Sequence, residues 1–322
     1  MKKMVSMACM GLSFLLLACG TQKQKAESQA PTVVQDGIRF CESTYPYDGG
    51  MLIANFGTEQ LNPLNTEGKG YILYCKEGKT STFIPADGNL SAPKGMYIGK
   101  GHLFVCDVNK ILVYNLDNRE AAPRTLTLPE GCLFANDLAA VGDTLYASVT
   151  NADKIFKIDI SDMDHLGAPV EWFTVPGPNG LLADGQSLYI ASYPADGNTQ
   201  PQHTIYRVAD VAAPALEKVI ETPGQYDGIA FSSDSTALYI TNWAPAGLSR
   251  VDLNTGTVTP VSISLDQPLV GPADITVIDQ HVYIPDLWGK EKRKAHPSAE
   301  GKLGVEGIPN RQIGRASCRE RV

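Results

Sequence analysis

The chain has 322 residues, with 27 basic and 35 acidic side chains and a formal net charge of −8. An acidic surface of this kind disfavours nucleic acid and anionic membranes as partners, and it tolerates cations. We therefore expect no nucleic-acid partner.

The N-terminus carries the pattern of an export signal. The chain begins MKK and continues as an apolar run to Ala18, which is shorter than the roughly 20 residues of a membrane-spanning helix. The tetrad LLAC, ending at Cys19, resembles the bacterial lipobox, in which the cysteine becomes lipid-modified. Gly20 replaces the aspartate that retains lipoproteins in the inner membrane. We predict a signal peptide at 1–18 and a lipidated, flexible tether at 19–33. The protein would then be exported and anchored at the outer membrane, facing the periplasm or the surface, although an ordinary signal peptide is the alternative.

A pattern of two short apolar strands around a polar turn then recurs six times. The copies begin at residues 42, 93, 134, 177, 226 and 272 and read ESTYPYDGGMLIANFG, PKGMYIGKGHLFVCDV, FANDLAAVGDTLYASVT, GPNGLLADGQSLYIASY, YDGIAFSSDSTALYITNW and PADITVIDQHVYIPDLW. One apolar position aligns all six, at Ile53, Phe104, Tyr146, Tyr189, Tyr239 and Tyr283. Third and fourth strand-like segments follow most copies. Four strands in about 45 residues are typical of a β-propeller blade.

The repeats predict an all-β fold, a six-bladed β-propeller with four-stranded antiparallel blades. A β-sandwich is the alternative. The last copy lacks clear third and fourth strands, so residues 32–41 are expected to supply an outer strand to that blade, because a propeller must close its edges. The propeller domain is assigned to residues 34–312. Residues 313–322, IGRASCRERV, resemble the translated read-through of a sequencing adapter and are expected to be a non-native tail on a C-terminally truncated domain.

Four cysteines remain between the two ends of the chain. No CxxC pair is present, which argues against a zinc site. Two of the four lie in apolar strand patterns, which favours buried thiols, with one or two disulfides as the alternative in an exported protein. The four are Cys41, Cys75, Cys106 and Cys132.

One residue stands at the start of the first strand in every copy, and we call these six the hub residues. They are Glu42, Lys94, Asn136, Asn179, Asp227 and Ala273. In a propeller the first strands line the central channel, so hub residues from different blades point toward one place. Four of them carry only oxygen ligands, two carboxylates and two amides, which suit Ca²⁺, with Mg²⁺ and Mn²⁺ as second choices and Zn²⁺ as a further alternative. The alternative is that Asn-Gly and Asp-Gly only form turns here.

At these positions the chain resembles the regucalcin/gluconolactonase family of six-bladed propellers. The motifs are Glu42-Ser43, Asn136-Asp137, Asn179-Gly180-Leu181 and Asp227-Gly228, and the resemblance spans about residues 40–290. It implies hydrolysis or formation of sugar lactones around a divalent cation, usually Ca²⁺. It implies Glu42, Asn179 and Asp227 as metal ligands, Asn136 as a substrate or water contact beside the ion, and Asp227 as the general base.

The chain departs from the family pattern at Phe134, where many members carry an arginine. Losing the guanidinium removes a fixed donor for a sugar hydroxyl or carboxylate. Phe134 is therefore expected either to stack on a pyranose ring or to be part of the core. Trp243 and Trp288 follow the second strands of copies five and six, and they are expected to line the same mouth of the channel or to pack between blades.

Three functions stay open at this point. The first is a Ca²⁺-dependent lactonase-like hydrolase of the cell envelope acting on a sugar lactone or related ester. The second is an envelope propeller that binds a carbohydrate or peptide without chemistry. The third is a structural propeller whose hub residues are only turns. In each case a monomer is expected.

Overall fold

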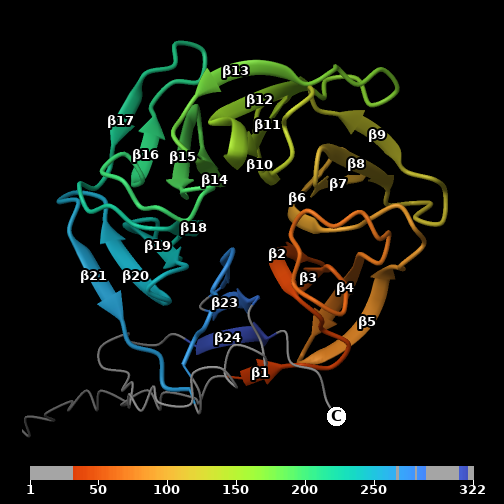
Figure 1. Ribbon diagram of the computed structural model, residues 1–322, viewed down its shortest axis with the longest axis horizontal. Helices are drawn as coiled ribbons and strands as arrows, with labels where there is room; N and C mark the ends of the chain where they lie inside the picture. The colour runs from red at the N-terminus through yellow and green to blue at the C-terminus, as the bar shows by residue number, and fades with distance from the viewer. Residues whose placement is uncertain (1–31, 266–267, 280, 288–311, 318–322) are drawn as a thin grey trace, which may run out of the picture.

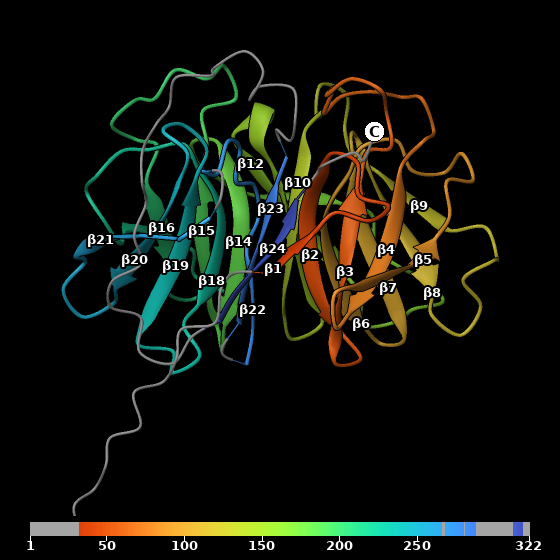
Figure 2. The same cartoon turned by 90° about the horizontal axis from the view of Figure 1, so that it is seen from below.

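The computed structural model describes residues 32–265, 268–279, 281–287 and 312–317. The predicted signal peptide, Cys19 and most of the tether lie outside these residues. Within them, no helix combines the length and hydropathy needed to cross a bilayer. Four-stranded sheets are arranged around a central axis, and the two views together show the shape of a β-propeller (Figures 1 and 2).

Five of the sheets consist of four antiparallel strands that follow one another in the chain. The first has β2 (Cys41–Tyr47), β3 (Gly50–Asn55), β4 (Tyr71–Lys76) and β5 (Lys79–Ile84). The second has β6 (Pro93–Gly99), β7 (His102–Asp107), β8 (Lys110–Asn115) and β9 (Arg124–Thr127). The third has β10 (Ala135–Val141), β11 (Thr144–Val149), the short 3₁₀ helix η1 (Thr150–Ala152), β12 (Lys154–Asp159) and β13 (Val170–Thr174). The fourth has β14 (Pro178–Asp184), β15 (Ser187–Ser192), β16 (Ile205–Val208) and β17 (Leu216–Lys218). The fifth has β18 (Tyr226–Phe231), β19 (Ala237–Asn242), β20 (Gly247–Asp252) and β21 (Val258–Val261).

The remaining sheet is mixed rather than antiparallel. Its order is β1 (Thr32–Val34), β24 (Gln312–Ser317), β23 (His281–Asp286) and β22 (Thr276–Ile278). Strand β24 runs parallel to both of its neighbours, which a short hairpin from β23 does not allow but a long connection does. Strand β1 lies at the outer edge, where residues 32–41 were expected. Because β24 falls almost wholly within the segment assigned to a non-native tail, the count of six blades stays a prediction.

The hydrophobic core lies between neighbouring blades. One cluster, for example, joins Phe104 and Val113 of the second blade to Leu145 and Phe156 of the third. The short alternating strands therefore bury one face against each neighbouring blade, as sheets in a propeller do. The prediction of buried thiols is confirmed, because all four cysteines of the described chain are free and buried: Cys41, Cys75, Cys106 and Cys132.

The innermost strand of each antiparallel blade contains an irregularity at the same place. In β10, for example, pairing with β11 breaks between Ala135 and Leu138, on either side of Asn136. The innermost strands of the other four antiparallel blades break at the equivalent step. A β-bulge re-aims the side chains within it. The hub residues thus leave the strand ladder at the point where the five innermost strands surround the axis (Figure 1).

Candidate functional site

A cavity of about 280 Å³ lies at the end of the channel where the innermost strands begin. Its polar lining includes Glu42, Asn136, Asn179 and Asp227, the four residues proposed as oxygen ligands from the sequence. Phe134 also lines it, so the predicted substrate contact belongs to the same cavity. The rest of the lining consists of Phe56, Leu61, Pro63, Tyr193, Trp243, Ala273 and Leu287. The structure therefore brings every predicted site residue in its described part to one place.

Four wall residues come from one repeat position, the residue after the second strand of a blade: Phe56, Tyr193, Trp243 and Leu287. Sequence reasoning anticipated only Trp243, and Trp288 lies outside the described residues. The repeat alignment already gives Tyr193 and Leu287 the place that Trp243 has in its own copy, whereas Phe56 was missed because the alignment is one residue out in the first blade. There Tyr45 pairs with Leu52 just as Tyr97 pairs with Phe104, so Leu52, rather than Ile53, is the equivalent position.

The hub residues are positioned by polar side chains at or just beyond the ends of the second strands. Asn242 at the end of β19 accepts a hydrogen bond at 2.8 Å from the backbone N–H of Gln225, close before Asp227. In the first blade Asn55 accepts one at 3.0 Å from the N–H of Arg39. Backbone N–H groups donate equivalent hydrogen bonds to the side chains of Asp107, Asn151 and Asp286. The segment entering each innermost strand is thus tied to its own blade.

Replacing Asn242 with alanine is expected to loosen Asp227. The change leaves the N–H of Gln225 and the carbonyl of Pro245 without the partner they have in Asn242. Losing such partners costs about 1–3 kcal/mol of unfolding free energy, measured by denaturant titration. We expect the variant to bind Ca²⁺ roughly tenfold more weakly, because Asp227 would be moderately misplaced as a ligand. A tenfold change in affinity corresponds to about 1.4 kcal/mol. The exposed Asn198, changed to alanine in parallel, serves as the control. Unchanged Ca²⁺ binding in the Asn242 variant would show that this contact only stabilises the fold.

Asn179 carries the polar atom that stands out in this cavity. Its side chain is 2% exposed, and its Oδ1 is buried with no hydrogen-bond partner in the structure. Buried polar atoms are nearly always hydrogen-bonded, and each exception calls for an explanation. An oxygen lone pair reserved for a bound ligand is such an explanation.

The two carboxyl groups of the cavity are buried in an apolar surrounding. The pKa of Asp227 is raised to about 8, first by burial and then by the charge of Asp274, while the Lys94 ammonium acts in the opposite direction. Burial, and then the charge of Asp227, raise the pKa of Glu42 well above its usual value. Two buried carboxylates that repel each other are stabilised by a positive charge between them or beside them.

Lys94, the hub residue of the second blade, is the buried cation nearest to these acids in the described chain. It is fully buried, and burial lowers its pKa while Glu42 raises it. Its Nζ donates to the carbonyls of Pro63 at 3.0 Å and Ala92 at 3.1 Å. The ammonium also lies 4.8 Å from the ring centre of Phe134 and 5.5 Å from that of Phe56. Lys94 therefore sits behind the aromatic wall, and its burial was not foreseen from the sequence.

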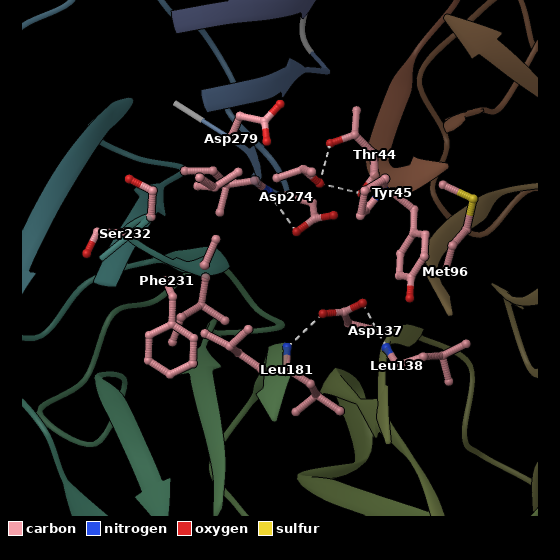
Figure 3. Close-up of a pocket in the computed structure, with 18 residues that line it drawn as sticks. Thr44, Tyr45, Met96, Asp137, Leu138, Leu181, Phe231, Ser232, Asp274 and Asp279 are labelled. Atoms are coloured by element: carbon pink, nitrogen blue, oxygen red, sulfur yellow. Dashed lines mark hydrogen bonds between the residues drawn. The ribbon is translucent and has the colours of Figure 1, made fainter. Parts of the chain in front are cut away.

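A second cavity of about 490 Å³ is lined by residues that follow the hub residues along the same strands (Figure 3). Asp137 accepts hydrogen bonds from the backbone N–H groups of Leu138 at 2.8 Å and Leu181 at 2.7 Å. Asp274 accepts the hydroxyl of Ser43 at 2.5 Å and the N–H of Ile275 at 2.7 Å. Burial raises the pKa of Asp274 to about 6. Both carboxyl groups accept hydrogen bonds from the chain, and none of the buried side-chain atoms that lack a partner in the described residues belongs to this cavity, in contrast to Asn179 Oδ1 in the first one.

A metal site built from charged or thiol ligands alone is not present in the described chain. No three histidine, cysteine, aspartate or glutamate side chains there are grouped to hold an ion. A cation in the first cavity would therefore depend on the amide oxygens of Asn136 and Asn179 as well as on the two carboxylates. Oxygen-only donors favour Ca²⁺, Mg²⁺ or Mn²⁺ over Zn²⁺.

Comparison of the sequence with protein families and with curated proteins gives no match. The solved structures that are similar to the chain include the following two. The first, a streptogramin B lyase structure, is 18% identical, with a TM-score of 0.43, and the match covers 57% of this chain and only 58% of that one. The second, a crystal structure of a nidogen/laminin complex, is 13% identical over 76% of this chain and 84% of that one, with a TM-score of 0.53. The likeness to the second structure bears on the fold alone: the chain is an all-β propeller, and its resemblance to the regucalcin/gluconolactonase family stays a prediction.

Proposed function

We propose that the first cavity binds a divalent cation, Ca²⁺ before Mg²⁺ or Mn²⁺, and hydrolyses a lactone or related ester. One observation carries the proposal. Four oxygen-bearing residues from four blades line one cavity, and one of these oxygens, Asn179 Oδ1, is buried without a partner. Within this proposal the chain is a six-bladed member of the regucalcin/gluconolactonase family.

The donor set fits a hard cation. Carboxylate and amide oxygens of mixed charge are the usual ligands of Ca²⁺. The buried carboxyl groups of Glu42 and Asp227 gain from a positive charge, and the Lys94 ammonium supplies only part of it, because it bonds two backbone carbonyls behind the wall. Glu42, Asn179 and Asp227 would hold the ion, with Asn136 beside them.

The chemistry then divides between the ion and the chain. A bound cation would polarise the ester carbonyl and stabilise negative charge on its oxygen. Asp227, as carboxylate, accepts the proton of the attacking water. Asn136 offers an amide to orient that water or the ester. The apolar walls exclude bulk water, which strengthens each of these polar interactions.

The same proposal gives the protein a place in the cell. It is exported, anchored through a lipid on Cys19 at the outer membrane, and acts as a monomer on a small molecule. These points rest on the sequence pattern of residues 1–33 and on the acidic charge.

Cation binding is tested by thermal unfolding with and without Ca²⁺. A ligand present at 100 times its dissociation constant stabilises the fold by about 2.7 kcal/mol, a shift of roughly 4–5 °C for a domain of this size. Asn179→Leu should abolish this shift while leaving the metal-free protein about as stable as the wild type, because Oδ1 has no partner to lose.

Asn65 provides the matched contrast. It is also buried, but its amide donates to the carbonyls of Asn62 and Ser91. Asn65→Leu should lower the stability of the metal-free protein by about 1–3 kcal/mol and keep the Ca²⁺ shift. An Asn179 variant that unfolds as easily as the Asn65 variant and still responds to Ca²⁺ would remove the basis of the proposal.

A second function, binding of a carbohydrate or peptide without chemistry, is favoured by one specific observation. Lys94 already places a positive charge next to Glu42, and the wall is largely aromatic and aliphatic. Ligand binding that is unaffected by removing divalent cations, together with no ester hydrolysis, would identify this function.

A further inference from the structure

We propose that the cavity selects a lactone or ester with a small apolar body, rather than a polyhydroxylated sugar lactone. The inference deepens the proposed function and rests on it. It concerns the walls of the cavity, whereas the proposed function rests on the hub residues at its base.

The walls offer almost no hydrogen-bonding groups. Apart from the hub residues, the lining is aromatic or aliphatic, and the hydroxyl of Tyr193 and the indole N–H of Trp243 are its side-chain polar groups. A sugar lactone carries a hydroxyl on nearly every ring carbon. Each hydroxyl buried without a partner weakens binding, because it gives up its hydrogen bonds to water.

The buried cation nearest to the two carboxyl groups in the described chain does not reach the ligand. Lys94 lies behind Phe134 and Phe56, at 4.8 and 5.5 Å from their ring centres, and is not part of the lining. Its bond to the carbonyl of Pro63 also fixes the loop that contributes Leu61 and Pro63 to the wall. A cation in this position stabilises an aromatic wall, and it cannot donate to a sugar hydroxyl inside the cavity.

The opposite side of the cavity is also aromatic. Tyr193 and Trp243, from the fourth and fifth blades, meet edge to face with ring centres 6.4 Å apart and planes at 87°. Aromatic pairs prefer an edge-to-face arrangement, so the two rings hold each other in place. The ligand therefore enters between two preformed apolar surfaces.

The volume limits the size of the ligand. About 280 Å³ equals the liquid volume of roughly nine waters at about 30 Å³ each. A six-membered lactone with a short alkyl chain fits this space, and δ-octalactone is a suitable probe. D-glucono-δ-lactone is the matched polar probe of similar size.

The first experiment compares kcat/KM for the two probes in the presence of Ca²⁺. We expect δ-octalactone to be preferred at least tenfold. Phe134→Ala should lower kcat/KM for δ-octalactone about 10- to 100-fold, within the range for lost apolar contacts in a pocket. Phe134→Arg should shift the ratio toward the sugar lactone. Phe173→Ala, the same change at a half-buried phenylalanine away from the cavity, should leave the ratio unchanged. Preference for D-glucono-δ-lactone overturns the inference.

The second experiment measures binding of the non-hydrolysable lactams of both probes by calorimetry, with the Ca²⁺ thermal shift as a separate readout. Tighter binding of the alkyl lactam that weakens in Phe134→Ala supports the inference even if no lactone is hydrolysed, in which case only the proposed hydrolysis fails. Tighter binding of the sugar lactam, or binding of neither, overturns the inference whether or not Ca²⁺ binds.

Discussion

Asp227→Asn is expected to lower Ca²⁺-dependent lactone hydrolysis by at least a thousandfold while the propeller stays folded. Asparagine keeps the shape of the side chain but cannot take a proton from water, and loss of a general base costs about 10²–10⁴ in rate. The variant also removes one of the two carboxylates that would hold the cation, so Ca²⁺ affinity should fall as well. The measurement is kcat/KM under saturating Ca²⁺, with thermal unfolding of the same preparation.

The folded state should tolerate this change because burying the carboxyl group lowers the free energy of unfolding of the metal-free protein. Asp227 is 7% exposed, and burial raises its pKa to about 8. A neutral amide of the same size is easier to bury. Asp143→Asn, at an exposed aspartate paired with Lys100 on the surface, is the control and should change neither activity nor unfolding. Full activity of the Asp227 variant would show that Asp227 is not the general base and would contradict the proposed mechanism.

The hub residues were predictable because a repeat turns spacing along the chain into position around an axis. Asn136, Asn179 and Asp227 occupy equivalent places in three copies, and the structure puts them on one cavity with Glu42. No single copy carries this information. The cavity follows from the closure of the propeller, which the sequence indicated only through the number and length of the strands.

What the sequence did not give depends on three-dimensional environment. Lysine is among the residues most rarely buried, so nothing in the sequence indicated that Lys94 would be enclosed by two phenylalanine rings and two carbonyls. Tyr193 stands at a repeat position that the sequence supplies, but only the structure shows that this position lines the cavity. Whether Asn179 Oδ1 has a hydrogen-bond partner depends on all the groups around it, which only the three-dimensional structure shows.

The last sheet shows a limit of another kind. Pattern reasoning placed a strand from residues 32–41 at its outer edge, and β1 lies there. The same reasoning set residues 313–322 aside, whereas the structure pairs β24 with β1 and β23. An open strand edge attracts any segment able to pair with it, so this pairing does not test whether the tail is native.

Gly180→Ala is expected to lower the free energy of unfolding by about 2–4 kcal/mol and to weaken Ca²⁺ binding at the same time. A Cβ built on Gly180 would lie 2.4 Å from the carbonyl oxygen of Asp227, closer than such atoms approach in proteins. The obstacle is backbone of the next blade rather than a flexible side chain, so strand β18 has to move. Overpacking of this kind typically costs 1–3 kcal/mol, and more where backbone cannot relax.

The displaced backbone belongs to the proposed base and metal ligand, which links stability to function in one substitution. Ser148 adds to the constraint on Gly180, because its hydroxyl donates to the carbonyl of Asn179 at 2.6 Å and holds β14 in place. Gly247→Ala is the matched control, since its Cβ would have as its nearest neighbour the carbonyl oxygen of Pro245 at 3.9 Å. Denaturant unfolding and the Ca²⁺ thermal shift should both be close to wild type in the control and both reduced in Gly180→Ala. If Gly180→Ala loses stability but keeps the full Ca²⁺ shift, the position of Asp227 does not govern cation binding, and Asp227 is not a ligand.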